Sequence, residues 1–281
     1  MKILIIGSSG ILGYYLFKEL SKKYKVYHTG LKKRLYDLTL RKNLKKIFNK
    51  KFDVVINCSA ITSIEFAEKN KKITSNINYK LVKDILILNK NKKNFYFINF
   101  STDHVYNYKK TYKNTEENIS FEDNYYTKSK IKVDKLIKKF KFLSLRINFF
   151  GKSFRGKGTF TDWLFLKSQN KEKIFLFEDQ IFSPLTLDTL SQIIKKIIVK
   201  KKCGLFNLGS KNVISKKSFA LMFFKNLGVT NVNYESVKVN NFLKIKRSNF
   251  MGMNSKKFSK QFKIKLPSIK QEIKKASKEY L

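Results

Sequence analysis

Short apolar runs alternate with longer stretches of helical periodicity along the first half of the chain. The apolar runs lie at residues 2–7, 25–30, 53–60, 94–101 and 142–148, and the helical patterns lie at residues 11–23, 40–49, 73–88 and 126–139. Continuous apolar strands that are joined by crossover helices form a parallel sheet covered on both faces. The pattern therefore predicts an α/β fold built on a doubly wound parallel sheet.

The regular alternation weakens after Gly151. Short strand-like pieces there separate three helical patterns, at residues 160–168, 187–198 and 216–227. No segment rich in Pro, Gly or Ser marks a linker. We therefore expect residues 1–150 to form the sheet domain and residues 151–281 to form a smaller region coupled to it.

The composition is that of a globular protein. With 281 residues and 42% apolar side chains, the chain can bury a full core. No apolar run approaches the roughly 20 residues that span a bilayer, and the opening MKILIIGSSG reaches glycine too early for a signal peptide. We expect a cytoplasmic protein without a membrane partner. Cys58 and Cys203 stand alone, without a CxxC spacing, so we expect two core thiols and no bound metal.

The formal net charge of +41 is unusually high. Such a charge is typical of proteins that bind nucleic acid or an anionic membrane surface. Here the lysines are scattered along the whole chain without a basic arm, and Asn, Ile, Phe and Tyr are also abundant, which is typical of a base-composition bias in the genome. We expect no nucleic-acid partner, but a basic surface attracts anionic small molecules such as nucleotides.

A glycine-rich loop at residues 7–13, GSSGILG, directly follows the first predicted strand and opens the first predicted helix. A Rossmann fold binds the pyrophosphate of a dinucleotide at this place. Gly7 permits the tight turn, Gly10 lets the backbone approach the phosphates, and Gly13 lets helix and strand pack closely. The spacing GxxGxxG is typical of extended short-chain dehydrogenases. We expect cofactor contacts from Gly7, Ser9, Gly10, Ile11, Leu12 and Gly13.

The end of the second predicted strand indicates which cofactor is used. An acidic residue there binds the ribose 2′-hydroxyl of NAD, whereas basic residues accommodate the 2′-phosphate of NADP. Residues 27–34 contain no acid and end in a basic triplet that includes Lys32 and Arg34. The sequence therefore favours NADPH, with NADH left open. Further cofactor contacts are expected at the ends of the next segments, from Asp37, Leu38, Ser59, Ala60 and Ile61.

A tyrosine and a lysine four positions apart on a helix share one face, so the ammonium group lies near the phenol. This spacing recurs in the lysine-rich chain, beginning at Tyr14, Tyr79, Tyr106, Tyr126 and Tyr234. Among these pairs, Tyr126/Lys130 is the one that follows a strand ending in Ser-Thr-Asp (101–103), at the sheet edge where open α/β proteins bind ligands. We select Tyr126 and Lys130 as the catalytic pair.

The chemistry of this pair suits ketone reduction. Hydride transfer from a nicotinamide to a ketone leaves a developing alkoxide, which needs a proton and hydrogen-bond donors already aimed at it. Tyr126 can supply the proton. Lys130 can favour the phenolate and anchor the cofactor ribose, and Thr102 can orient the carbonyl.

Several segments together resemble the dTDP-4-dehydrorhamnose reductase family. These segments, in chain order, are KILIIGSSGILG at residues 2–13, DLT at 37–39, DVVINCSAITSIEFAE at 53–68, NIN ending at Asn78, INFSTDHVYN at 98–107, NYYTKSK at 124–130, LRIN with Arg146, and EDQIFSPLT at 178–186. The resemblance covers most of residues 1–190 in the right order, whereas the sequence after Gly209 matches poorly.

The resemblance implies roles for particular residues. Thr102 is the donor to the substrate oxygen, Tyr126 is the proton donor and Lys130 is its partner. Asn78 joins the cofactor contacts, and the two domains are interleaved. Substrate contacts are expected from Thr102, Asp103, His104, Asp179 and Gln180. The chain departs from the family at Thr127, where glycine is usual, and around the Ser-Thr-Asp strand at His104 and Tyr106.

The sequence therefore predicts an oxidoreductase that reduces a nucleotide-linked 4-keto-6-deoxysugar with NADPH. One alternative is a sugar-nucleotide epimerase or dehydratase, which uses the same tyrosine and lysine but recycles tightly bound NAD. Another is a noncatalytic regulatory subunit that retains the dinucleotide fold. A homodimer is left open.

Overall fold

The structure, a computed structural model, describes residues 1–30, 37–90, 95–107, 113–119 and 122–281. The chain forms two compact units. The first unit holds residues 1–101, 124–145 and 191–205, and the second holds residues 102–123, 146–190 and 206–281. These bounds differ from a single division after residue 150. Residues 102–123 belong to the second unit, and residues 191–205 belong to the first.

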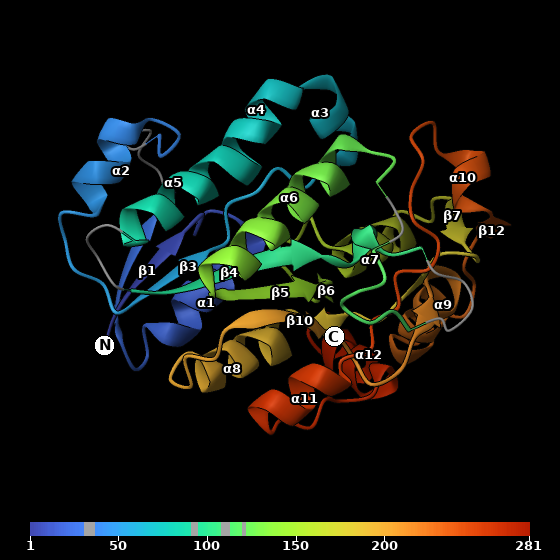
Figure 1. The fold of residues 1–281 in the computed structure, drawn as a ribbon. Coiled ribbons are helices and arrows are strands. Elements are labelled where there is room, and N and C mark those ends of the chain that lie inside the picture. Colours follow the sequence, from blue (N-terminus) through green and yellow to red (C-terminus); the bar gives the residue numbers. More distant parts are fainter. Residues whose placement is uncertain (31–36, 91–94, 108–112, 120–121) are drawn as a thin grey trace. The chain divides into compact units, whose positions relative to one another are not determined.

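A six-stranded sheet with the order β10-β5-β4-β3-β1-β2 carries the first unit (Figure 1). Its strands are β1 (Lys2–Ile6), β2 (Lys25–Thr29), β3 (Val54–Asn57), β4 (Tyr96–Thr102), β5 (Leu143–Ile147) and β10 (Gly204–Leu208). β1 pairs in parallel with β2 and β3, and β3 pairs in parallel with β4. The predicted doubly wound parallel sheet is confirmed.

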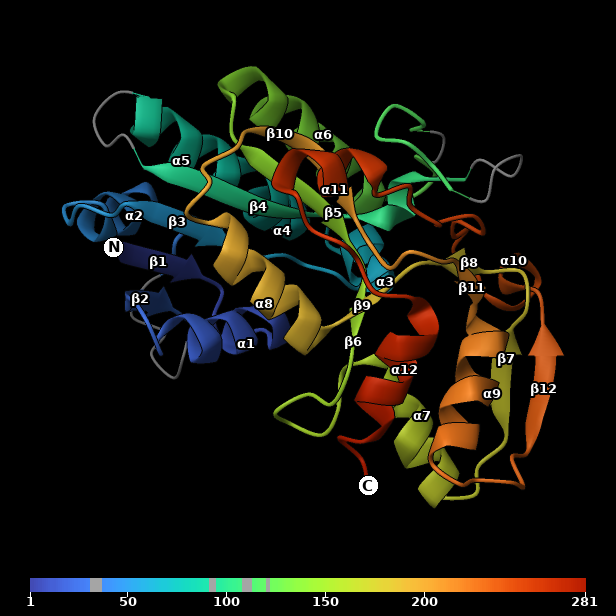
Figure 2. The same cartoon turned by 90° about the horizontal axis from the view of Figure 1, so that it is seen from below.

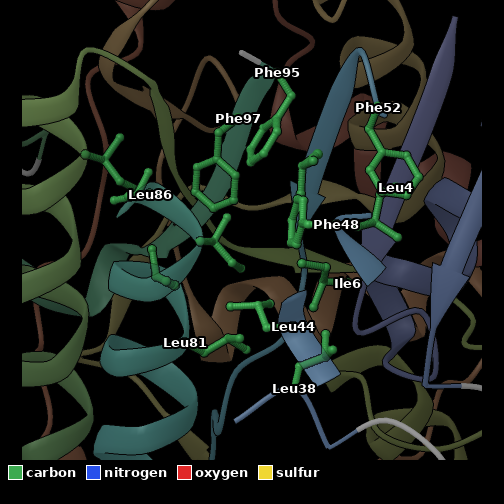
Figure 3. Close-up of a cluster of buried hydrophobic side chains, with 14 of the residues drawn as sticks. Leu4, Ile6, Leu38, Leu44, Phe48, Phe52, Leu81, Leu86, Phe95 and Phe97 are labelled. Atoms are coloured by element: carbon green, nitrogen blue, oxygen red, sulfur yellow. The ribbon is translucent and has the colours of Figure 1, made fainter. Parts of the chain in front are cut away.

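Helices cover both faces of this sheet (Figure 1). The helices α1 (Ile11–Leu20) and α8 (Leu187–Ile197) lie on one face, and α2 (Arg41–Ile47), α5 (Leu81–Leu88) and α6 (Tyr125–Phe140) lie on the other. Between α2, α5 and the sheet, Figure 3 shows a hydrophobic cluster that includes Leu4 and Phe97. Phe48 stacks on Phe95 in this cluster, with ring centroids 5.1 Å apart. The apolar runs are continuous because both faces of the strands are buried.

The segment predicted as one helix over residues 73–88 has three parts. It consists of α4 (Lys71–Ser75), a π-helical turn η1 (Asn76–Lys80) and α5, and it is preceded by α3 (Ile64–Lys69). Short π-helical turns inside α-helices frequently occur at functional sites. The turn carries Asn78, whose buried side chain makes hydrogen bonds to Ile61 and Ser129, so side-chain contacts from outside the helix accompany the interruption.

The second unit contains short strand pairs and helices. Its strands are β6 (Phe149–Phe150), β7 (Ile174–Phe177), β8 (Ile181–Phe182), β9 (Leu185–Thr186), β11 (Ile214–Ser215) and β12 (Tyr234–Val237). Its helices are the 3-10 turn η3 (Asp103–Val105), α7 (Phe160–Gln169), α9 (Lys216–Asn226), α10 (Val239–Phe242), α11 (Lys256–Phe262) and α12 (Ile269–Ser277). Figure 2 shows α9 between the β7–β12 pair and α12. The buried residues Phe219 and Phe223 of α9 contribute to a second hydrophobic cluster, with Phe150 and Leu164.

The two cysteines lie in different environments. Cys58 is partly buried at the end of β3, whereas Cys203 is exposed. The prediction that both thiols lie in the core is wrong for Cys203, because this residue belongs to the loop that joins α8 to β10. Within the described residues, no helix is long and apolar enough to cross a membrane.

Candidate active site

The glycine loop has the geometry that its sequence requires. Gly7 has a φ of +83°, which other residues rarely adopt, and a Cβ atom there would lie 2.7 Å from the backbone nitrogen of Ser59. A Cβ atom at Gly13 would lie 2.3 Å from the carbonyl oxygen of Gly7. α1 begins after Gly10, and no side chain caps its first turn. The helix N-terminus is therefore available for a phosphate group.

Side chains beside this loop fix it to the sheet. Ser8 is buried, and its Oγ donates to the carbonyl oxygen of Thr29 at the end of β2 over 2.8 Å.

The other predicted cofactor residues of this region lie after β2. Asp37 accepts hydrogen bonds from the backbone and side chain of Thr39, and the side chain of Leu38 lies in the hydrophobic cluster of Figure 3. Lys32 and Arg34, which carry the prediction of NADPH, lie outside the described residues.

The predicted nicotinamide segment, Ser59 to Ile61, follows β3. Asn78 holds its last residue at two points: its side-chain oxygen accepts from the N–H of Ile61 over 2.8 Å, and its side-chain nitrogen donates to the carbonyl of Ile61 over 3.1 Å. The same nitrogen lies 3.0 Å from the Oγ of Ser129 on α6. Asn78 thus joins the predicted cofactor segment to the helix that carries Tyr126 and Lys130.

The predicted catalytic pair lies in the first two turns of α6, and both side chains are buried. The ammonium group of Lys130 donates to the carbonyl oxygen of Phe100 in β4 over 2.8 Å. Burial lowers the pKa of Lys130 to about 8, against the opposing effect of the Asp134 carboxylate. The carboxylate of Asp134 in turn accepts from Ser101 and Ser144. Lys130 is therefore a desolvated cation at a fixed place beside the end of β4.

Burial separates this pair from its rivals. In the pairs that begin at Tyr14, Tyr79 and Tyr234, the lysines are exposed. The lysine of the pair at Tyr106 is not described by the structure, and Tyr106 itself bonds to Arg146 and Asn207 inside the second unit. Among the lysines of these pairs that the structure describes, Lys130 is the one that is buried. An ammonium group there can act on its surroundings with little screening.

Thr102 is the last residue of β4, and the next residues form η3. The Oγ of Thr102 accepts from the N–H of His104 over 3.2 Å. Asp103 accepts from the amide of Asn148 over 2.7 Å, and burial raises the pKa of Asp103 to about 7. Burial lowers the pKa of His104 to about 3, with further effects of Lys216 and Arg247. His104 is therefore neutral, and Asp103 titrates near neutral pH.

Asp179 and Gln180 hold a neighbouring segment in place. The carboxylate of Asp179 accepts from the N–H of Val239 over 2.9 Å and from the amide of Asn249 over 2.7 Å. The amide of buried Gln180 donates to the carbonyl of Ser248 over 2.9 Å. These bonds position the segment that carries Arg247, whereas substrate contacts of Asp179 and Gln180 stay a prediction.

A pocket of 450 Å³ in the second unit combines aromatic side chains with two basic ones. It is lined by Phe160, Trp163, Phe175, Leu176, Phe177, Lys216, Leu243 and Arg247. The ammonium group of Lys216 lies 5.4 Å from the ring centre of Phe160 and 5.9 Å from that of Phe177. Burial lowers the pKa of Lys216 to about 8, with Arg247 adding to the effect. The site reasoning from sequence missed Lys216, because nothing distinguishes it among so many lysines.

Within the parts of the chain that the structure describes, no group of three or more His, Cys, Asp or Glu residues could hold a metal ion. The hydrogen-bond donors of the site are backbone N–H groups, one phenol and buried ammonium groups. These groups suit an anionic dinucleotide and a carbonyl substrate.

A parallel sheet whose first strand leads through a glycine loop into an uncapped helix is the Rossmann-type fold of the short-chain dehydrogenase class. The chain belongs to the family described as "RmlD substrate binding domain", whose sequence pattern matches residues 1–281. The resemblance to the dTDP-4-dehydrorhamnose reductases is thereby confirmed.

Single proteins with a similar fold or sequence include members of this family. The fold is similar to that of dTDP-4-dehydrorhamnose reductase from Bacillus anthracis in complex with NADP, with a TM-score of 0.88, 21% identity and coverage of 98% of each chain. The corresponding protein from Clostridium acetobutylicum gives a TM-score of 0.88 at 24% identity, also over 98% of each chain. The spore coat polysaccharide biosynthesis protein SpsK of Bacillus subtilis is 24% identical over 230 residues, which are 81% of this chain and 80% of that protein.

Proposed function

We propose that this protein reduces the keto group of a nucleotide-linked 4-keto-6-deoxysugar with NADPH. The observation that carries the proposal is the buried Lys130 one helical turn after the buried Tyr126, in a member of this family. The relative from Bacillus anthracis was solved with NADP, which agrees with the absence of an acid at the end of β2. Since NADPH and nucleotide sugars are metabolites of the cytoplasm, we place the protein there.

The residues of the chain have separate tasks in this reaction. NADPH, when bound, supplies the hydride that reduces the ketone. The glycine loop and the open end of α1 bind the pyrophosphate of the cofactor. Tyr126 donates its phenolic proton to the developing alkoxide. Lys130 keeps a positive charge near the phenol, and Thr102 donates a hydrogen bond to the same oxygen.

The aromatic pocket of the second unit suits the nucleotide part of the substrate. Aromatic rings offer flat apolar faces on which a base can stack, and Arg and Lys side chains bind diphosphate oxygens through charge-assisted hydrogen bonds. Lys216 and Arg247 bring two such cations to a pocket that also contains Phe160 and Trp163. We assign the base to the rings and the diphosphate to the two cations.

This assignment predicts that nucleotide-sugar affinity falls as the pH rises. Between pH 6 and pH 9, Lys216 loses a positive charge near its pKa of about 8, and Asp103 gains a negative charge near its pKa of about 7. His104 stays neutral over this range because its pKa is about 3. Both titrations make the pocket less attractive to an anion, so the Kd is expected to rise about tenfold, or about 1.4 kcal/mol.

Isothermal titration calorimetry with dTDP-glucose at four pH values measures this change, because the charge of its diphosphate diester is constant over the range. A Lys216→Arg variant keeps its charge and is expected to lose most of the rise above pH 8. Equal steepness in Lys216→Arg and the unchanged protein would contradict the assignment.

A labelled cofactor tests the reaction itself. The purified protein is incubated with a dTDP-linked 4-keto-6-deoxysugar and NADPH that carries deuterium at the transferable position. We expect deuterium on the product sugar carbon, with an equal loss of NADPH. An epimerase would isomerise the sugar without net loss of NADPH, and a regulatory subunit would bind cofactor without turnover, so either result would overturn the proposal.

A further inference from the structure

We infer that Glu68 is a positioning residue: from a second helix, α3, it fixes the place of the proton donor Tyr126. The inference rests on the proposed function, since it gives Tyr126 the role of proton donor. Glu68 lies at the end of α3, 57 positions before Tyr125. Its carboxylate accepts a hydrogen bond from the backbone N–H of Tyr125, the first residue of α6.

Several backbone groups in the first turn of α6 make hydrogen bonds to side chains. Asn124 caps the helix, since its side-chain oxygen accepts from the N–H of Thr127 over 3.0 Å. Glu68 satisfies the N–H of Tyr125, and the Oγ of Ser129 donates to the carbonyl of Tyr126 over 2.6 Å. The backbone of Tyr126 is therefore restrained on both sides. Of these three restraints, Glu68 is the one that comes from a segment distant in sequence.

A carboxylate suits this place for electrostatic reasons. The N-terminus of a helix carries partial positive charge, and a charged acceptor on a backbone N–H makes a stronger hydrogen bond than a neutral one. Lys71 lies 3.8 Å from the other carboxylate oxygen of Glu68 and 6.0 Å from the centre of the Tyr125 ring. The carboxylate is thus held between a cation of its own segment and the start of α6.

The position of Glu68 also joins α6 to the predicted nicotinamide segment. α3 begins three residues after Ile61, and Asn78 joins Ile61 to Ser129 one turn further along α6. Two links therefore run from the cofactor side to α6, at Tyr125 and at Ser129. Lys130 has its own anchor at the carbonyl of Phe100. Loss of Glu68 should loosen the turn that carries Tyr126 while Lys130 keeps its place.

The chain offers a matched control on the same helix. Glu65 is an exposed acid in the first turn of α3, and its carboxylate accepts a hydrogen bond from the Oγ of Ser63. Glu65→Ala removes the same charge from α3 without touching the Tyr125 bond. Glu68→Gln keeps an oxygen acceptor for the N–H of Tyr125, whereas Glu68→Ala removes it and Glu68→Asp shortens its reach.

Steady-state kinetics of the full chain test the inference. For Glu68→Ala we expect kcat to fall about 10- to 100-fold, because small displacements of a reacting group have effects of this size. The KM for NADPH should stay within about twofold, and the solvent deuterium isotope effect on kcat should rise because proton delivery becomes slower. The kcat of Glu68→Gln should lie within about threefold of that of the unchanged protein. The kcat of Glu65→Ala should equal that of the unchanged protein.

Hydrogen exchange gives a readout that does not depend on turnover. Amide exchange in peptides that cover residues 124–130 is expected to become faster in Glu68→Ala but not in Glu65→Ala. Unchanged exchange, or unchanged kcat, in Glu68→Ala overturns the inference. If Glu68→Ala does not fold, an unchanged kcat in Glu68→Asp overturns it instead. If the unchanged protein turns over no keto sugar while exchange responds as expected, the proposed reaction fails and the positional role of Glu68 stands.

Discussion

Replacing Tyr126 with phenylalanine is expected to lower kcat by about 10²- to 10⁴-fold, the usual contribution of a general acid. The ring stays in its buried place on α6 and only the phenolic oxygen is lost, so the KM for NADPH should change by less than about twofold. Stopped-flow or steady-state loss of NADPH absorbance with a nucleotide-linked keto sugar measures both constants.

The neighbouring residue provides the control for this change. Tyr125 precedes Tyr126 on the same helix and is only partly buried. Tyr125→Phe removes a phenolic oxygen to which no role is assigned and keeps the backbone N–H that binds Glu68. Tyr79→Phe tests one of the rival tyrosine–lysine pairs in the same way. Full activity of Tyr126→Phe, together with loss of activity in Tyr79→Phe, would mean that the catalytic pair has been assigned to the wrong helix.

Replacing Lys130 with methionine is expected to weaken both cofactor binding and turnover. A hydrogen bond from a charged group contributes about 1.5 to 3 kcal/mol, so the Kd for NADPH should rise about 10- to 100-fold. The turnover number should fall as well, because the phenol loses its neighbouring cation. Fluorescence titration with NADPH measures the affinity, and Lys128→Met, an exposed lysine of the same helix, is the control.

The pH dependence of stability tests whether Lys130 is buried as a cation. The pKa of Lys130 is lowered to about 8 in the folded protein, whereas the pKa of a lysine in an unfolded chain is about 10.4. Between these values the unfolded state binds more protons, so the stability of the unchanged protein rises with pH. Relative to Lys130→Met, the unchanged protein should therefore gain in Tm between about pH 8 and pH 10. A Tm difference that is constant from pH 7 to pH 10 would contradict a buried, charged Lys130.

Much of the fold could be predicted from local patterns. Strands β1, β3 and β4 are buried along nearly their whole length because helices cover both faces of the sheet, and runs of consecutive apolar residues indicate this burial in the sequence. Gly7 and Gly13 indicate the cofactor loop in the sequence. Gly7 has a positive φ, and a side chain at either position would collide with the backbone. The succession of strands and helices along the chain, the loop and the choice of Tyr126/Lys130 rest on signals of this kind.

The tertiary structure alone decided the electrostatic environment of the charged groups and revealed Lys216. The pKa values of Lys130 and Lys216 are lowered because segments distant in sequence bury both side chains. The bonds of Glu68 to Tyr125 and of Asn78 to Ser129 span more than fifty positions each, and no periodicity reports them. Local sequence encodes the preferences of a strand, a turn or a helix face, whereas desolvation and long-range hydrogen bonds exist only once distant segments have packed together.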